Sequence, residues 1–412
     1  MAGHGLKLIG ARVRRVLGRF AVAVLVAASA LSTGAEARTT ARPAWKIEID
    51  ELVEGLQVGV SVREAGQFLY RHADKVLRTP ASNQKLLLAM ALLGRLGPGL
   101  RIPIMARANI VEPGGVIPGN LWVIGRGDPH VGPNDLADLA QEIADAGITR
   151  VQGSVKGAIT YFAHDWWARG WKPYFPDQYI PLPSALTYLG NVDGGRHIRD
   201  PERRAARELT AQLRALGISV GGAADAGDPP PGLRHIAEVR SPSLAVLLQN
   251  MLTHSINFSA EVLGKRLGVH RYGVPGNIAK GANAIEGWAA GRGVQTLGYD
   301  GSGLSYANRV APAGIARLLG VVEDLPWGDD LMEALPGPGE GTLSYRLAGV
   351  PVRAKTGTLT ERSALSGWVY LQETGTWAEF SIISKGLPVS RAKDLEDRIV
   401  RILWRDARGP AG

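Results

Sequence analysis

Ser82 and Lys85 stand three residues apart at the start of a long apolar stretch, and this pairing can activate a serine. Residues three apart share one face of a helix, so the two side chains are neighbours if the stretch is helical. Burial lowers the pKa of a lysine, and a neutral amine can accept the proton of a hydroxyl group. The sequence therefore predicts Ser82 as a nucleophile and Lys85 as its base.

A second serine-lysine pair with the same spacing is present at Ser390 and Lys393. Serine is a common N-cap residue, and we expect Ser390 to cap the C-terminal helix. Because such pairs are common for structural reasons, the first pair needs partners elsewhere in the chain to indicate chemistry.

One candidate partner is the segment that contains Ser255 and Asn257, which lies in a bend between two apolar stretches. The hydroxyl of Ser255 could move a proton, and the amide of Asn257 could bind a substrate carbonyl and hold Lys85. The alternative is that either residue only caps the following helix.

A second candidate partner is Lys355-Thr356-Gly357-Thr358, where a strand is predicted to begin. Lys355 would supply a fixed positive charge for a carboxylate, and Gly357 would let a substrate backbone approach the strand edge. The N–H groups of Thr358 and Ser82 could together form an oxyanion hole. The alternative is an ordinary lysine at a strand edge.

The elements that must position these residues are predicted by their apolar patterns. The stretch 80–93 is apolar all round after its first turn, which is typical of a buried helix. A hairpin of strands at 56–62 and 67–70 precedes it. Predicted later elements are helices at 243–252, 257–267, 279–290 and 312–323, strands at 364–373 and 377–384, and a final amphipathic helix at 393–405.

Residues 101–235 differ in composition from the rest of the chain, because they are richer in Pro and Gly. A short strand is predicted at 119–124, and helices are predicted at 135–145 and 202–216. We interpret this block as an inserted mixed α/β domain that splits one α/β domain into 38–100 and 236–412. An aromatic cluster in the insert is predicted to be a loop packed by its own rings rather than a ligand platform; it comprises Trp166, Trp167, Trp171, Tyr174, Phe175 and Tyr179.

Composition narrows the function classes. The 412 residues include no cysteine, which excludes disulfides, thiolate metal sites and cysteine nucleophiles. The net charge is +9, but no basic run with interleaved aromatics is present, so nucleic acid is the weaker interpretation. The histidines are scattered without ligand spacing, and neither a metal nor a cofactor is expected.

The N-terminus has the organisation of a signal peptide. A basic region precedes an apolar run at 20–31, and Ala35-Glu36-Ala37 offers a small-x-small cleavage site. We predict a signal peptide at 1–37, cleavage after Ala37 and a linker from Arg38 to Trp45; the alternative is an uncleaved anchor.

The motifs in this order resemble the D-alanyl-D-alanine carboxypeptidase/endopeptidase family of low-molecular-mass penicillin-binding proteins, the DacB type with a large insertion. Two further stretches carry the resemblance, Gly125-Arg126-Gly127-Asp128-Pro129 and Asp300-Gly301-Ser302-Gly303-Leu304-Ser305. The resemblance covers nearly all of the chain after residue 37 and implies a β-lactamase/transpeptidase-like fold. The insertion is short for the family, so a third nested domain is expected to be reduced or absent.

The resemblance implies acyl transfer. Ser82 would attack the carbonyl of a terminal D-Ala-D-Ala bond, Lys85 would act as base, and Ser255 would pass the proton to the leaving amine. Asn257 would hold the acyl side chain. The residues Lys355 and Thr356 would hold the terminal carboxylate, beside Gly357 and Thr358.

Peptidoglycan stem peptides are the implied substrates, β-lactams are the implied covalent inhibitors, and the implied location is the periplasm. The stretch 300–305 is expected to line the cleft or to support the domain. Two alternatives remain: a β-lactamase-like hydrolase, and a non-catalytic wall-binding protein that retains the fold. The sequence does not decide between carboxypeptidase and endopeptidase activity.

Overall fold

The computed structural model describes residues 42–408. The predicted signal peptide at 1–37 and the cleavage site after Ala37 lie outside the described residues. Within residues 42–408, no helix combines the length and the apolar character that crossing a membrane requires.

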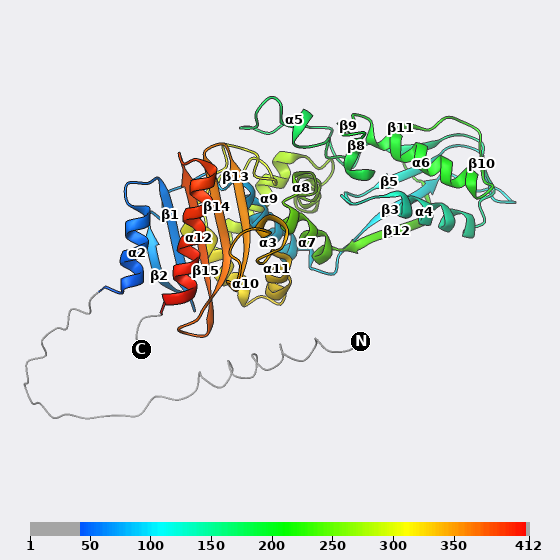
Figure 1. The fold of residues 1–412 in the computed structure, drawn as a ribbon. Coiled ribbons are helices and arrows are strands. Elements are labelled where there is room, and N and C mark those ends of the chain that lie inside the picture. Colours follow the sequence, from blue (N-terminus) through cyan, green and yellow to red (C-terminus); the bar gives the residue numbers. More distant parts are fainter. Residues whose placement is uncertain (1–41, 409–412) are drawn as a thin grey trace, which may run out of the picture. The chain divides into compact units, whose positions relative to one another are not determined.

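A five-stranded antiparallel sheet, in the order β13-β14-β15-β1-β2, organises the part of the molecule that contains the motifs (Figure 1). The N-terminal hairpin pairs with β15 of the C-terminal hairpin, so the two ends of the chain rejoin in one sheet. This confirms the predicted α/β class. The strands are β1 (Val58–Glu64), β2 (Gln67–His72), β13 (Val352–Leu359), β14 (Arg362–Leu371) and β15 (Thr376–Lys385).

The side chains of each strand alternate between the two faces of the sheet, because successive residues of a strand point in opposite directions. On β14, Ala364 and Trp368 face one core, whereas Leu365, Val369 and Leu371 face the other. Both faces are apolar, and helices must therefore cover both.

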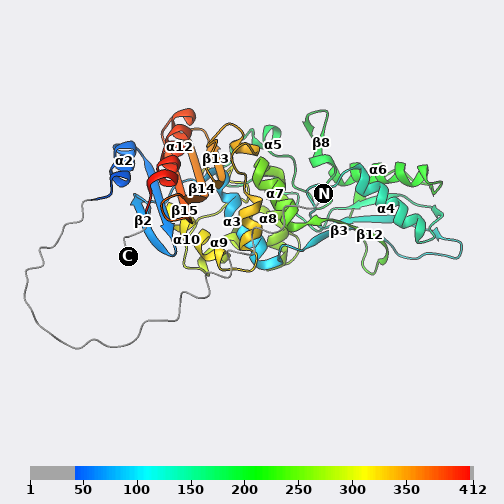
Figure 2. The same ribbon diagram turned by 60° about the horizontal axis from the view of Figure 1, so that its bottom comes forward.

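Helices α2 (Ala44–Val53) and α12 (Val389–Asp406) cover one face, and α3 and its neighbours cover the other (Figures 1 and 2). The linker predicted from Arg38 to Trp45 is wrong at its described end, because Trp45 is buried in α2. The helices on the second face are α3 (Gln84–Leu96), α7 (Leu244–His254), α8 (Asn257–Tyr272), α9 (Ile278–Ala290), α10 (Pro312–Glu323) and α11 (Gly328–Ala334).

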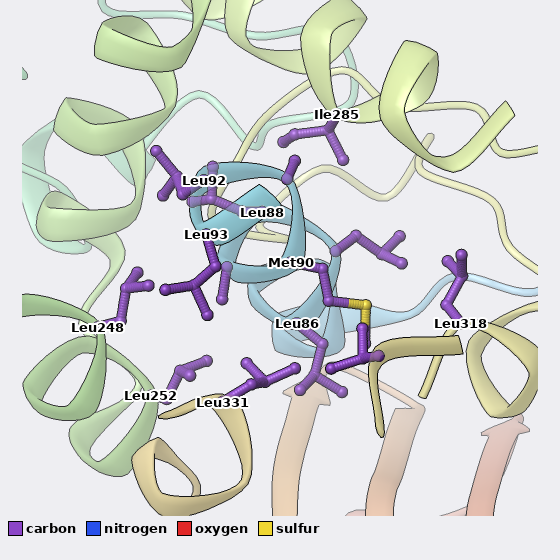
Figure 3. Close-up of a cluster of buried hydrophobic side chains, with 14 of the residues drawn as sticks. Leu86, Leu88, Met90, Leu92, Leu93, Leu248, Leu252, Ile285, Leu318 and Leu331 are labelled. Atoms are coloured by element: carbon purple, nitrogen blue, oxygen red, sulfur yellow. The ribbon is translucent and has the colours of Figure 1, made fainter. Parts of the chain in front are cut away.

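Helix α3 runs through the middle of the larger core, as its all-apolar sequence predicts (Figure 3). Every residue from Leu86 to Leu93 is buried. The helix packs against residues of five others: Leu248 and Leu252 of α7, Leu263 of α8, Ile285 of α9, Leu318 of α10 and Leu331 of α11. Each fully buried leucine contributes about 1.5–3 kcal/mol to the free energy of unfolding. The buried part of α3 therefore holds the first turn of the helix in a fixed position.

Residues 101–243 form a second five-stranded sheet in the order β11-β7-β5-β3-β12, with α4 and α6 in its core. Strands β3 and β12 were not predicted, and β12 extends across the boundary expected at 235. That boundary stays a prediction. The elements are β3 (Arg101–Ala108), β4 (Val116–Ile117), β5 (Leu121–Gly125), α4 (Pro133–Asp145), β6 (Arg150–Val151), β7 (Val155–Ala158), α5 (Phe175–Gln178), β8 (Val192–Asp193), β9 (Arg196–His197), α6 (Pro201–Ala215), β10 (Ser219–Val220), β11 (Asp225–Gly227) and β12 (Arg234–Ser243).

The expectation that Ser390 caps the last helix is wrong. Helix α12 begins at Val389, with Pro388 in the N-cap position and no side-chain cap hydrogen bond. Ser390 therefore lies inside the first turn, where the proline before it has already fixed the helix start.

Candidate active site

Ser82 lies in a short 3-10 turn, η1 (Ala81–Asn83), which leads directly into α3. The residue before it, Ala81, has a φ of 48°, a left-handed conformation that is uncommon for alanine. Such strain persists only where the surroundings hold it, and it is frequent at functional sites. On the other side, Asn83 is fully buried and donates a 2.7 Å hydrogen bond to Ser366 Oγ on β14. The turn that carries Ser82 is therefore fixed from both sides.

Lys85, in the first turn of α3, is fully buried, and its Nζ has three oxygen partners. Ser82 Oγ is at 3.1 Å, Asn257 Oδ1 at 2.8 Å and the Ser302 carbonyl oxygen at 2.6 Å. A neutral amine has two N–H groups and one lone pair. Because the amide and the carbonyl oxygens can only accept, they take the two N–H groups, and the lone pair is left for the hydroxyl of Ser82.

Burial lowers the pKa of Lys85 to about 7, against the opposing attraction of Asp300 and then Glu261. An amine with a pKa near 7 is present in its neutral form in a large fraction at neutral pH. The geometry and the charge state therefore both suit a general base.

Ser255 and Asn257 stand on either side of the junction between α7 and α8. Ser255 has a left-handed φ of 56° at the end of α7, and α8 begins at Asn257 after Ile256 in the N-cap position. No side chain caps α8, so neither residue has the purely structural role that was the alternative. The Asn257 amide also donates a 3.4 Å hydrogen bond to the Tyr179 carbonyl.

The Lys355–Thr358 segment lies on β13, the edge strand of the sheet, next to the turn of Ser82. A Cβ at Gly357 would lie 2.7 Å from the Pro80 carbonyl oxygen and 3.1 Å from the Ser82 nitrogen. Only glycine allows this close approach, which brings the strand edge against the backbone of the nucleophile.

The fixed positive charge expected at Lys355 stays a prediction. Lys355 is fully buried and donates a 2.9 Å hydrogen bond to the Thr356 carbonyl oxygen. Burial, and then repulsion from Lys85, lower its pKa well below the usual value. Burial therefore makes the ammonium form of Lys355 less favourable than that of an exposed lysine, and the charge of an arriving carboxylate would oppose this effect.

The three motifs border one cleft of about 850 Å³, although they lie far apart in the sequence. Its lining includes Ser82, Ser255, Asn257, Thr356 and Thr358. The two lysines lie beneath this surface and are absent from the lining. A substrate in the cleft would therefore meet hydroxyl groups, an amide and a strand edge, with the amines one layer behind.

The inserted segment contributes aromatic rings to the same cleft. Tyr174, Phe175 and Tyr179 line it, with ring centroids 5.1–6.0 Å apart. The predicted packing among these rings is present, but the two tyrosines are also about half exposed to solvent and belong to the cleft lining. The same rings can therefore both pack against one another and border the cleft.

The Asp300–Ser305 stretch lies under the site as a hydrogen-bonded loop. Its Asp300 carboxylate is fully buried and accepts from the indole N–H of Trp171, which belongs to the inserted segment. It also accepts from the backbone N–H groups of Gly303 and Ser305.

Glu261 was missed by the sequence reasoning. It is 1% exposed and accepts the backbone N–H groups of Gly301 at 2.9 Å and Ser302 at 2.6 Å. Its only signal in the sequence is an acidic residue between the apolar Ala260 and Val262, four positions after Asn257, which places Glu261 and Asn257 on one helix face.

The Gly125–Pro129 motif does not reach the cleft. Asp128 is buried, and burial raises the pKa of its carboxyl to about 6 while the His130 N–H opposes that shift. Its carboxylate accepts that N–H at 2.9 Å, so the motif shapes a turn. Among residues 42–408, no group of three or more acidic or histidine side chains is arranged to hold a metal ion.

Comparisons with known proteins agree on one family. The model of the D-Ala-D-Ala carboxypeptidase 3 (S13) family matches residues 46–197 and 189–406. A D-alanyl-D-alanine carboxypeptidase of Actinomadura sp. (strain R39) is 28% identical, covering 82% of this chain and 79% of the relative. A carboxypeptidase of Mycobacterium tuberculosis is also 28% identical, with 82% and 78% covered.

Solved structures support the fold. Penicillin binding protein 4 of Haemophilus influenzae superposes with a TM-score of 0.77 at 22% identity, over 87% of this chain and 99% of that one. The same protein complexed with a β-lactam superposes with a TM-score of 0.70 at 23% identity.

Proposed function

This chain belongs to the D-Ala-D-Ala carboxypeptidase 3 (S13) family, and on that premise we propose that Ser82 is the nucleophile of its reaction. The enzyme is a serine-type D-Ala-D-Ala carboxypeptidase, a hydrolase. The observation that carries the residue assignment is the contact of Ser82 Oγ with a buried, depressed-pKa Lys85, whose two other partners are both acceptors.

In the acylation step, Ser82 Oγ attacks the carbonyl carbon of the D-Ala-D-Ala bond while Lys85 Nζ takes the hydroxyl proton. The N–H groups of Ser82 and Thr358 would stabilise the developing oxyanion. Ser255 relays a proton to the leaving amine, the C–N bond breaks, and terminal D-Ala departs. Water then hydrolyses the ester on Ser82 and restores the free serine.

Substrate binding is assigned to residues at the two walls of the cleft. The amide of Asn257 would hold the acyl side of the stem peptide. The Thr356 hydroxyl would hold the terminal carboxylate directly, and the Lys355 ammonium would act on it from beneath the cleft surface, where the negative charge of the carboxylate favours protonated Lys355. The edge of β13 at Gly357 leaves room for an extended peptide backbone.

The same site explains why β-lactams should act as covalent inhibitors. A β-lactam presents a strained amide to Ser82, and acylation opens the ring without releasing a fragment. Export to the periplasm, through the predicted signal peptide, would bring the enzyme to peptidoglycan stem peptides.

The test is muropeptide analysis after incubation with purified wild type, Ser82→Ala and Ser390→Ala. The Ser390 variant is a matched control, because that serine also precedes a lysine by three residues. Wild type and Ser390→Ala should release D-Ala from pentapeptides, and Ser82→Ala should release none. Loss of cross-linked dimers in the same samples would reveal endopeptidase activity as well.

Labelled penicillin distinguishes the alternatives. A stable adduct on Ser82 supports the proposal, whereas rapid penicillin turnover would indicate a β-lactamase-like hydrolase. A wild-type protein that binds sacculi without forming an adduct or releasing D-Ala would be a non-catalytic wall-binding protein.

A further inference from the structure

Lys85 depends on the loop beneath it for one of its two acceptors. The Ser302 carbonyl oxygen is its shortest contact, at 2.6 Å. That carbonyl belongs to the peptide unit whose other end, the Gly303 N–H, donates to Asp300 Oδ1 at 3.0 Å. The two preceding N–H groups, of Gly301 and Ser302, both donate to Glu261 Oε1.

Glu261 thus fixes the loop at the point where it meets the base. It lies on α8, one turn after Asn257, which is the second acceptor of Lys85. A single helix therefore places one acceptor directly and the other through the loop backbone. If the loop moved, the N–H groups of Lys85 would lose the geometry that directs its lone pair at Ser82.

We propose that Glu261 is a positioning residue for Lys85, acting through the backbone of Gly301 and Ser302 to hold the carbonyl that orients the base. The inference rests on the proposed function of Ser82 and Lys85 and assigns to the same site a residue that touches neither substrate nor nucleophile.

Glu261 also acts on Lys85 through its charge. Charged or titratable groups face this region from each element packed on it: Lys85 of α3, Glu261 and Lys265 of α8, Asp300 of the loop and Lys355 of β13. Burial, and then Asp300, raise the pKa of Glu261 to about 8, while the negative form of Glu261 raises that of Lys85. Protonation of Lys85 and ionisation of Glu261 therefore favour one another.

Two substitutions separate position from charge. In Glu261→Gln, the amide oxygen can still accept both backbone N–H groups, but no negative charge can form. In Glu261→Ala, both the acceptor and the charge are lost. Glu286→Ala is the matched control, because Glu286 of α9 also accepts a loop N–H, that of Gly298 at 2.6 Å, and is not one of the three hydrogen-bond partners of Lys85 Nζ.

The measurement is the second-order rate constant for acylation by labelled penicillin, as a function of pH. We expect Glu261→Gln to be acylated within about threefold of the wild-type rate at each pH, because the amide oxygen can still accept both backbone N–H groups. We expect Glu261→Ala to lose about 100-fold, as a misplaced base does. Glu286→Ala should keep the wild-type rate and pH profile.

The outcomes are distinguishable from failure of the proposed function. If wild type forms no adduct on Ser82, the proposed function fails. If wild type is acylated and folded Glu261→Ala is acylated at the same rate with the same pH profile, the inference is overturned. Should Glu261→Ala not fold, Glu261→Met takes its place, because methionine keeps the volume of the side chain without a carboxylate or amide acceptor. A folded Met variant that is acylated at the wild-type rate would overturn the inference.

Discussion

Asn257 Oδ1 lies 2.8 Å from Lys85 Nζ, across 172 residues of sequence. A carboxylate in the place of this amide would put a negative charge beside the amine and stabilise its ammonium form. We expect Asn257→Asp to raise the pKa of Lys85, so that the pH below which penicillin acylation slows moves upward by roughly 1–3 pH units. The measurement is the acylation rate constant between pH 5 and 9. An unchanged pH dependence in a folded variant would contradict the close contact.

The acylation rate of the wild-type enzyme should itself decrease below neutral pH. The pKa of Lys85 is about 7, and only the neutral amine can accept the Ser82 proton. Acylation should therefore fall about tenfold per pH unit below that value and level off above it. Circular dichroism at each pH checks that folding is constant. A rate that is flat down to pH 5 would exclude Lys85 as the base.

Lys85→Arg tests the need for a neutral base. Arginine stays protonated at all accessible pH values, and its planar group does not match the three contacts of Lys85. Acylation and D-Ala release should fall about 10²–10⁴-fold, the usual contribution of a general base. The control variant is Lys75→Arg, at an exposed position outside the cleft lining, which should retain D-Ala release within a few-fold.

Gly303 provides a test of the turn that carries the nucleophile. Its φ is +83°, and an added Cβ would lie 1.9 Å from the Ala81 carbonyl oxygen. Gly303→Ala should slow acylation about 100-fold by displacing Ser82. Gly217→Ala is the control, because its φ is +82° with nothing near the new Cβ. It should cost about 1–2 kcal/mol of stability and leave acylation unchanged. If Gly303→Ala and Gly217→Ala changed the acylation rate equally, the contact between the new Cβ at position 303 and the Ala81 carbonyl would not be the cause.

Glu379 on β15 should make stability depend on pH. It is 2% exposed with Oε2 unpartnered, and burial, then Glu323, raise its pKa to about 8 from 4.5. Between these values the unfolded chain releases the proton while the folded protein retains it, so stability falls as pH rises through this window. Glu379→Gln should therefore raise the Tm at pH 8 by several degrees and leave it unchanged near pH 4. Glu142→Gln, at an exposed position, should change neither value.

Much of the fold was predictable because local patterns determined it. The all-apolar run after Ser82 is typical of a buried helix, and the start of α10 follows from Pro312 at the first helical position. The missed strands β3 and β12 are stabilised mainly by pairing with each other across more than a hundred residues. A sequence pattern does not encode such a partner.

The site was predictable to the extent that side chains define it. Ser82, Lys85, Ser255, Asn257 and Thr356 carry recognisable chemistry at recognisable spacings. The Ser302 carbonyl oxygen could not be predicted, because every residue has one and only the folded loop aims this one at Lys85. The burial of Lys355 likewise depends on tertiary packing.

The indole of Trp171 donates a 2.7 Å hydrogen bond to Asp300, so the inserted segment supplies part of the scaffold under the reaction centre. Removal of the whole segment would leave a buried carboxylate short of one donor and the loop above it less constrained. Engineering that trims this enzyme to a smaller catalyst should therefore keep the strip around residues 163–182 even where the outlying sheet is discarded. The same dependence means that a partly synthesised chain carries a chemically ordinary serine, which gains its reactivity only when distant segments have folded around it.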